Sequence, residues 1–196
     1  MPYWGLYLQS EQFSAADIGI LMSLFQISRI FAPNLWGWLA DHTKQRVKWI
    51  KLTALLGLLG FVAVFWAHGF WWLFFVMAAL SLFTSSTLPL SESLTLAHLA
   101  TTNGHYSRIR MWGSLGFIFA AVILGFLIDI YGIKSLLWFL LVVQIILFGL
   151  TFKLPEATVA PHADDHFSIW SIIKQPVVIA LLLGCALMVT AHGVLY

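Results

Sequence analysis

The sequence predicts an all-α membrane protein that crosses the bilayer several times, and three observations support this prediction. Hydrophobic residues make up 61% of the 196 residues and charged residues only 9%, which is more apolar than a water-soluble domain of this length. Apolar runs long enough to span roughly 30 Å of hydrocarbon recur along the chain. Nearly all lysines and arginines fall in alternate gaps between these runs, as in a membrane protein with a fixed orientation.

The apolar runs define the expected helices in order. Residues 1–8 are too few to span a bilayer and predict only the end of a helix. A polar turn follows, in which Ser14 and Asp17 have the pattern of a capping box at the start of the next helix. Full spans are then expected at residues 18–40, 52–67, 73–96, 111–128 and 135–152. The last apolar run covers residues 177–196.

These elements group into three expected parts. Residues 1–153 form a transmembrane bundle, residues 154–175 a central cytoplasmic loop, and residues 176–196 the first helix of a second bundle. The loops near 41–51, 98–110 and 153–175 are expected in the cytoplasm, because one set of gaps holds eight lysines and arginines and the opposite set holds only Lys134. Those eight are Lys44, Arg46, Lys48, Lys51, Arg108, Arg110, Lys153 and Lys174.

The composition also excludes several classes of function. The single cysteine, Cys185, permits no disulfide within the chain. A net charge of +2 is too small to suggest a nucleic-acid partner. No zinc-protease motif, phosphate-binding loop or nucleophile elbow is present, so we expect no enzyme and no cofactor. The pair His162 and His166 with two aspartates between them could hold a metal, but in a polar loop a solvated linker is expected instead.

The segment Gly37-Trp-Leu-Ala-Asp41 ends the first full span and is followed by basic residues. It resembles the cytoplasmic signature between helices 2 and 3 of the major facilitator superfamily, on the matching residues Gly37, Leu39, Ala40, Asp41 and Arg46. The departures from it are His42, Lys44 and Gln45. Lys44 stands where the signature has glycine, so a tight turn through glycine is not available.

In this signature the glycine allows close helix approach, and the aspartate can meet a helix N-terminus and basic side chains. The resemblance implies that Gly37, Asp41 and Arg46 latch one state of a transporter. The alternative is a solvated basic loop without a gating role.

A second constellation consists of Glu92, Arg110 and the pattern Arg-x-x-Gly-x-x-Gly-Phe at residues 110–117. It resembles the phenylpropionate-transporter-like and lactose-permease-like (oligosaccharide:proton symporter) branch of that superfamily. In that branch an acid on helix 4 and an arginine on helix 5 hold the substrate, and an aromatic residue stacks on it. The resemblance implies these roles for Glu92, Arg110 and Phe117, and the glycines are expected to admit a neighbouring helix. For Arg110 the alternative is an anchor that reaches the headgroups.

Two further residues are candidates. Arg29 lies twelve residues before Asp41, about 18 Å along a helix and therefore near the midplane of the bilayer. It is expected either to face a polar cavity that binds substrate or to form a structural ion pair, such as one with Glu92. His192, before Gly193, resembles the helix 7 pattern of the phenylpropionate-like members and can either carry protons or pack between helices.

An internal similarity fits the same family. Gly37-Trp-Leu-Ala-Asp41 and Gly125-Phe-Leu-Ile-Asp129 end spans that run in opposite directions. An inverted repeat of three helices would leave such a trace, although common helix-end residues could also match by chance.

Taken over the whole chain, the resemblance implies a six-helix N-terminal bundle with a 3+3 inverted repeat plus helix 7, truncated at both ends. It further implies a secondary active transporter with proton-coupled uptake by alternating access. A phenylpropionate-like aromatic acid is the first expected substrate, followed by a sugar or nucleoside. The expected partners are substrate, protons, the lipid of a bacterial inner membrane and a C-terminal six-helix half. The alternative is a non-transporting membrane subunit or scaffold.

Overall fold

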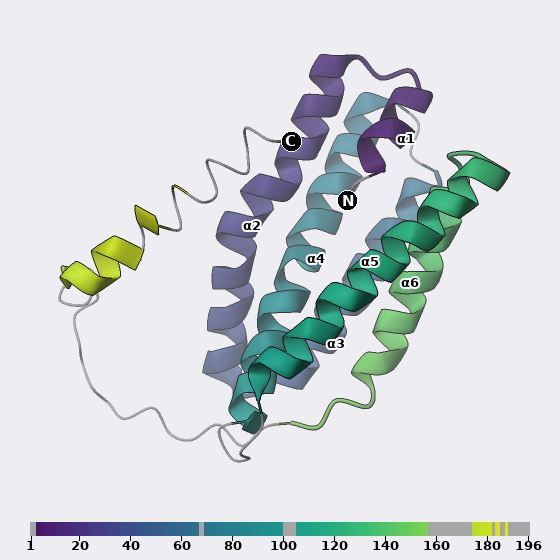
Figure 1. The fold of residues 1–196 in the computed structure, drawn as a ribbon. Helices are drawn as coiled ribbons and strands as arrows, with labels where there is room; N and C mark the ends of the chain where they lie inside the picture. Colours follow the sequence, from purple (N-terminus) through teal and green to yellow (C-terminus); the bar gives the residue numbers. More distant parts are fainter. Residues whose placement is uncertain are drawn as a thin grey trace. The chain divides into compact units, whose positions relative to one another are not determined.

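The computed structural model describes residues 3–66, 69–99, 105–156, 174–181, 183–184 and 187. The chain divides into two units, residues 1–158 and 159–196. The helices of the first unit are α1 (Trp4–Ser10), α2 (Ala15–Thr43), α3 (Arg46–Val64), α4 (Phe70–Leu99), α5 (Tyr106–Tyr131) and α6 (Ser135–Thr151) (Figure 1). In the second unit, residues 176–181 are helical.

All regular structure in the described residues is helical, and helices α2, α3, α4 and α5 are long and apolar enough to cross a membrane. The predicted all-α membrane fold is therefore confirmed. The α2–α3 turn, the start of α5 and the end of α6 lie at the same end of the first unit (Figure 1). This end collects most of the basic residues, as expected for alternate gaps between antiparallel spans.

Polar side chains fix both ends of α2. At its start the Ser14 hydroxyl accepts from the Asp17 N–H at 3.2 Å, and the Asp17 carboxylate accepts from the Ser14 N–H at 3.2 Å. This confirms the predicted capping box. At the other end Lys44 adopts a left-handed conformation with φ of 53°. The turn is therefore made without the glycine of the family signature: Lys44 itself takes the left-handed conformation, at a strain of about 1 kcal/mol.

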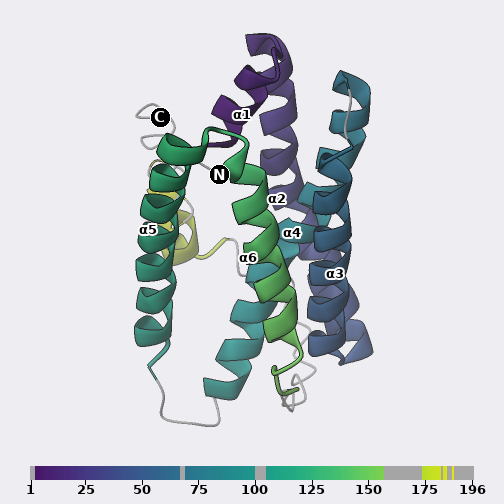
Figure 2. The same cartoon turned by 90° about the vertical axis from the view of Figure 1, so that its right-hand side faces the viewer.

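Helices α2, α3 and α4 pack closely, with α4 lying against both other helices (Figures 1 and 2). The Ser28 and Ser81 hydroxyls hydrogen-bond across α2 and α4 at 2.7 Å. The Trp36 indole donates to the Leu82 carbonyl at 3.3 Å. A methyl group on Gly57 would lie 3.1 Å from Thr84. We call these three helices the closed set.

Helices α1, α5 and α6 make up the rest of the first unit, and we call them the open set after the sparsely packed α5. Helix α6 lies between α5 and α3 (Figure 2). The seven-residue α1 packs at one end, where Trp4 is buried against Phe61 of α3 and the Tyr3 hydroxyl approaches Gly125 of α5. Among all residues of α5 only Leu124 is buried. Most of the α5 surface therefore has no partner within the described residues.

The glycines expected to admit a neighbouring helix, Gly37 of α2 and Gly113 and Gly116 of α5, meet open space instead. A methyl group on Gly37, Gly113 or Gly116 would meet no described atom within 4 Å. That expectation is wrong for the described part of the chain, because Gly113 faces a cavity rather than a helix. The close approaches involve Gly57 and Gly125, which the sequence did not distinguish.

Candidate functional site: two cavities along one membrane helix

A cavity of about 680 Å³ lies between α4 and α5. We call it the α4–α5 cavity. Its volume is in the range of small-molecule sites in proteins. Most of its lining is apolar, and its polar side chains are Ser91, Glu92, Thr95, Tyr106, Arg110 and Ser114. An apolar chamber with a few convergent polar groups is the usual form of a site for a small organic ligand.

The central polar feature of this cavity is the ion pair between Glu92 of α4 and Arg110 of α5, in which Arg110 Nη1 donates to Glu92 Oε1. The structure brings together these two residues, which are 18 positions apart. The Arg110 side chain is 58% exposed and that of Glu92 33% exposed. The pair is therefore reachable by a molecule in the cavity, and its remaining donors and acceptors can hydrogen-bond to that molecule.

Phe117 lines the same cavity two helical turns from Arg110, with Gly113 and Ser114 between them on the same face of α5. Its ring is 64% exposed. Glycine at position 113 leaves open space beside the guanidinium. The arrangement offers a planar donor, a carboxylate acceptor and an aromatic face within one chamber.

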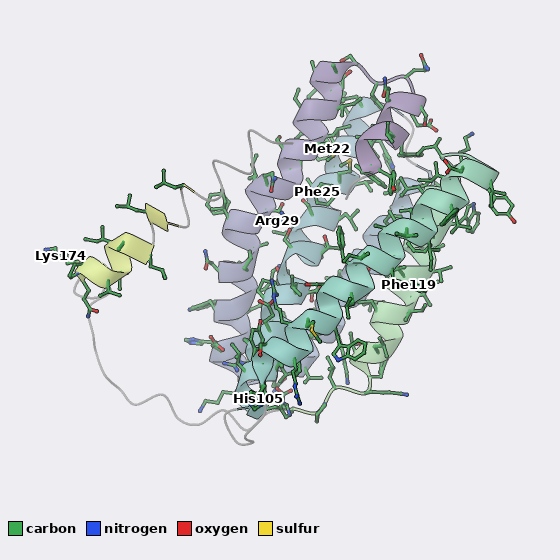
Figure 3. All side chains as sticks on the ribbon, viewed as in Figure 1. Met22, Phe25, Arg29, His105, Phe119 and Lys174 are labelled. Atoms are coloured by element: carbon green, nitrogen blue, oxygen red, sulfur yellow. The ribbon has the colours of Figure 1, made fainter. Side chains whose placement is uncertain are left out.

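A second cavity of about 250 Å³ lies between α2 and α4, and we call it the α2–α4 cavity. Figure 3 shows three of its α2 residues, Met22, Phe25 and Arg29, in succession along the helix. Arg29 Nη1 donates to Gln26 Oε1 at 3.5 Å. The ion pair considered between Arg29 and Glu92 is not formed, because Glu92 accepts from Arg110.

Two prolines lie just beyond this second cavity in sequence. Pro33 is inside α2 and Pro89 inside α4. Because proline has no N–H, each leaves the carbonyl four residues earlier without its usual helical donor. Those carbonyls belong to Arg29 and Ser85, and both residues line the α2–α4 cavity.

At the basic end of the bundle, Asp41 accepts from Arg46 Nη2 at 2.8 Å and from Nε at 3.2 Å. The Arg46 side chain is only 11% exposed, whereas that of Asp41 is 62% exposed. Gly37 lies one turn before Asp41 in the same helix. The structure therefore joins the end of α2 to the start of α3 through a fork-shaped contact.

The acid at the N-terminus of α3 is not Asp41. The Val47 N–H donates to Glu156 at 3.1 Å and 3.3 Å, to its two carboxylate oxygens. A negative charge at a helix N-terminus is favourable. Sequence reasoning missed Glu156, because 109 residues separate it from Val47 and the only sequence signal was an acid just after α6.

Two predicted features fall outside the described residues: His192 and the histidine pair at 162 and 166. Within the described ranges no group of three histidine, cysteine or acidic residues is placed to hold a metal ion.

Four helices in the described part of the chain, long and apolar enough to cross a membrane, define an integral membrane protein of the polytopic helical class. The chain belongs to the MFS_1 like family, whose model matches residues 1–196. This confirms the resemblance to the major facilitator superfamily on which the sequence interpretation rests.

Individual relatives of the chain are consistent with this family. The chain is 40% identical over 130 residues to "Maltose permease" of Geobacillus stearothermophilus, covering 65% of this chain and 33% of that protein. It is 36% identical over 127 residues to "Uncharacterized transporter YwbF" of Bacillus subtilis, covering 64% and 32%. It is 26% identical over 138 residues to "Probable 3-phenylpropionic acid transporter" of Escherichia coli, covering 70% and 36%. The chain thus spans about a third of the length of these relatives.

Proposed function

We propose that this chain forms the N-terminal bundle of a secondary active transporter that moves a small organic molecule across a bacterial inner membrane. The observation that carries the proposal is the Glu92–Arg110 pair, which lines an apolar cavity and stays exposed within it. Charged groups inside membrane segments are costly and are usually retained for a function. The relatives are named as a permease and transporters, and none is named as an enzyme.

The chemistry of the cavity suits a molecule with polar groups on an apolar or aromatic body. Arg110 presents a planar fork that can bind a carboxylate or two hydroxyls, and Glu92 accepts hydroxyl hydrogen bonds. Phe117 offers a ring for stacking on an aromatic or sugar ring. We place a phenylpropionate-like aromatic acid first and a sugar or nucleoside second, in line with the substrates in the relatives' names.

We further propose alternating access with a C-terminal six-helix half, with substrate held between the halves. The contacts of Arg46 with Asp41 and of Glu156 with α3 tie three segments together at the basic end. Such a contact can hold one state and open in the other. By the distribution of lysine and arginine this end faces the cytoplasm. Proton coupling is part of the proposal, with His192 a candidate carrier.

The deciding experiment is uptake of radiolabelled 3-phenylpropionate and maltose by membrane vesicles that contain the full-length gene product. Arg110→Ala removes the planar donor from the cavity and leaves the Glu92 carboxylate without its partner, so uptake should fall at least tenfold. Arg110→Lys should also fail where the contact uses both arms of the fork. The matched control is Arg108→Ala, an exposed arginine two residues before Arg110 that does not itself line the cavity.

At equal membrane abundance, near-normal uptake by Arg110→Ala would reduce Arg110 to an interfacial anchor. A stronger defect in Arg108→Ala than in Arg110→Ala would also reject the site. No uptake of any substrate by the wild type, with normal growth on substitution of Glu92 and Arg110, would favour a scaffold.

A further inference from the structure

We propose that the α2–α4 cavity is an anion subsite, in which Arg29 binds the carboxylate of the transported molecule while Glu92 and Arg110 hold a polar group at its other end. The inference rests on the proposed transport function and adds the charge and length of the substrate. It assigns the carboxylate to Arg29 rather than to Arg110.

The first argument is the common wall of the two cavities. Thr84 and Ser85 line the α2–α4 cavity, and Ser91, Glu92 and Thr95 line the α4–α5 cavity. At 100° per residue, these five positions fall on one face of α4. Ser85 and Glu92 are seven residues apart, which is two turns or about 10 Å along the helix axis. One elongated molecule lying along this face can therefore reach both cavities.

The second argument is charge. In the α4–α5 cavity the guanidinium of Arg110 is balanced by Glu92. In the α2–α4 cavity Arg29 donates to the neutral Gln26, and no carboxylate of the described residues is within ion-pair distance. The described residues that line the two cavities thus carry one excess positive charge, that of Arg29. A guanidinium at this depth is stabilised by a carboxylate that accepts two of its N–H groups.

The third argument is the polarity of the backbone beside Arg29. Pro33 and Pro89 withhold helical donors from the carbonyls of Arg29 and Ser85. In membrane helices such carbonyls are satisfied by neighbouring hydroxyls or by ordered water. Two residues of the same small cavity are affected, so this part of the wall can hold water or a substrate hydroxyl beside the carboxylate.

The remaining lining defines the body of the ligand. Phe25 and Met22 add apolar surface about one and two turns from Arg29 on α2 (Figure 3). Phe117 adds an exposed ring in the other cavity. The chemical class is a monocarboxylate with an aromatic or alkyl body and a hydrogen-bonding group about 10 Å from the carboxylate, set by two helical turns. Neutral sugars lack the group that Arg29 selects.

The test measures equilibrium binding to the purified full-length gene product in nanodiscs, with two pairs of probes that differ in charge: 3-(4-hydroxyphenyl)propionate against its amide, and glucuronate against glucose. The wild type should bind at least one acid more tightly than its neutral partner. Arg29→Gln should weaken binding of that acid about ten- to hundredfold, the value of a hydrogen bond to a charged group. Binding of the neutral partner should change less than threefold. Arg108→Gln, which removes an exposed charge outside both cavities, should bind both probes as the wild type does.

Arg29→Lys keeps the charge without the fork and should give an intermediate loss for the acid. Because Arg29→Lys retains the positive charge, its binding of the two probes can still be measured if Arg29→Gln does not fold. An unchanged preference for the acid in both variants would overturn the anion subsite. Equal loss of acid and neutral probe in a folded variant would also overturn it and indicate a structural ion pair. A wild type that binds glucose or the amide better than the acids would reject the subsite but leave transport standing, and binding of none of the four would reject both proposals.

Discussion

The long helices of the closed set differ in packing from α5, the long helix of the open set, although all of them are apolar. Eight of the nineteen residues of α3 are buried, against one of the twenty-six residues of α5. In the closed set α4 lies along both α2 and α3, and hydroxyl and indole groups connect α2 to α4. In the open set the Tyr3 hydroxyl, just before α1, approaches Gly125 near one end of α5, and the α4–α5 cavity lies along residues 106–118 at the other end.

The difference shows that hydropathy reports insertion into lipid and not packing between helices. Lipid tails are as apolar as leucine, so a buried and a lipid-facing leucine look alike in sequence. What separates the two sets is where small and hydroxyl side chains meet a partner. Gly57 and Ser81 do so in the closed set, whereas Gly113 and Gly116 of α5 face open space within the described residues.

The largest expected effect is that truncating a side chain in the closed set lowers the free energy of unfolding, whereas truncating one in the open set lowers substrate affinity. Trp36→Ala removes a side chain that is 9% exposed, packs on Trp49 and Phe83 and donates to Leu82. We expect a loss of about 3 kcal/mol in the free energy of unfolding, near the lower limit for Trp→Ala in cores, because lipid replaces part of the lost apolar contact. Phe117→Ala should lower substrate affinity but leave stability within about 0.5 kcal/mol, as for exposed positions.

Thermal unfolding in detergent, followed by size-exclusion fluorescence, compares the two variants. Equal destabilisation by both would show that α5 is packed as tightly as α2, and the distinction between the sets would fail.

Glycine-to-alanine substitutions in the two sets are expected to change the free energy of unfolding in opposite directions. In Gly57→Ala the new methyl group would lie 3.1 Å from Thr84 Cγ2, so the Thr84 side chain or the helices must give by a few tenths of an ångström. We expect a destabilisation of about 1–3 kcal/mol from overpacking. In Gly116→Ala the methyl group meets open space, and better helix propensity should stabilise by about 0.5–1 kcal/mol. Differential scanning fluorimetry of both variants beside the wild type measures the signs, and a shared sign would contradict the packing described.

The same contrast between local hydropathy and helix packing explains which features the sequence could predict. The six helices, the capping box at Ser14 and the polytopic class follow from local patterns, and the structure confirms them. The pairing of Glu92 with Arg110 was expected from a family resemblance in spacing, not from local physics. The contact of Glu156 with α3 depends on which segments meet at the end of the bundle, and hydropathy does not encode that in lipid. For Arg29 the sequence left a polar cavity and an ion pair as alternatives, and the structure places it at a cavity.

Glu156 connects the two sets, because it follows α6 and accepts from the first turn of α3. Glu156→Ala removes this cap and its charge at a helix N-terminus, so we expect a loss of about 1 kcal/mol. The effect should shrink at high salt, since Glu156 is exposed and charge interactions there are screened. Unfolding midpoints at low and high salt check it, with Lys153→Ala, an exposed change in the same segment, as the control. A loss independent of salt would argue for packing rather than capping.

The smallest effect concerns the turn that closes α2. Lys44 adopts a left-handed backbone with φ of 53° and ψ of 26°, which strains any residue with a Cβ. Lys44→Gly removes that strain but increases the freedom of the unfolded chain, so the net gain should be up to about 1 kcal/mol. Lys48→Gly, inside α3, has no such strain to relieve and should instead destabilise by about 1 kcal/mol through lost helix propensity. Because both variants lose one exposed lysine, the difference between their unfolding midpoints isolates the backbone term. A destabilised Lys44→Gly would mean that the lysine side chain contributes more to this turn than its backbone conformation costs.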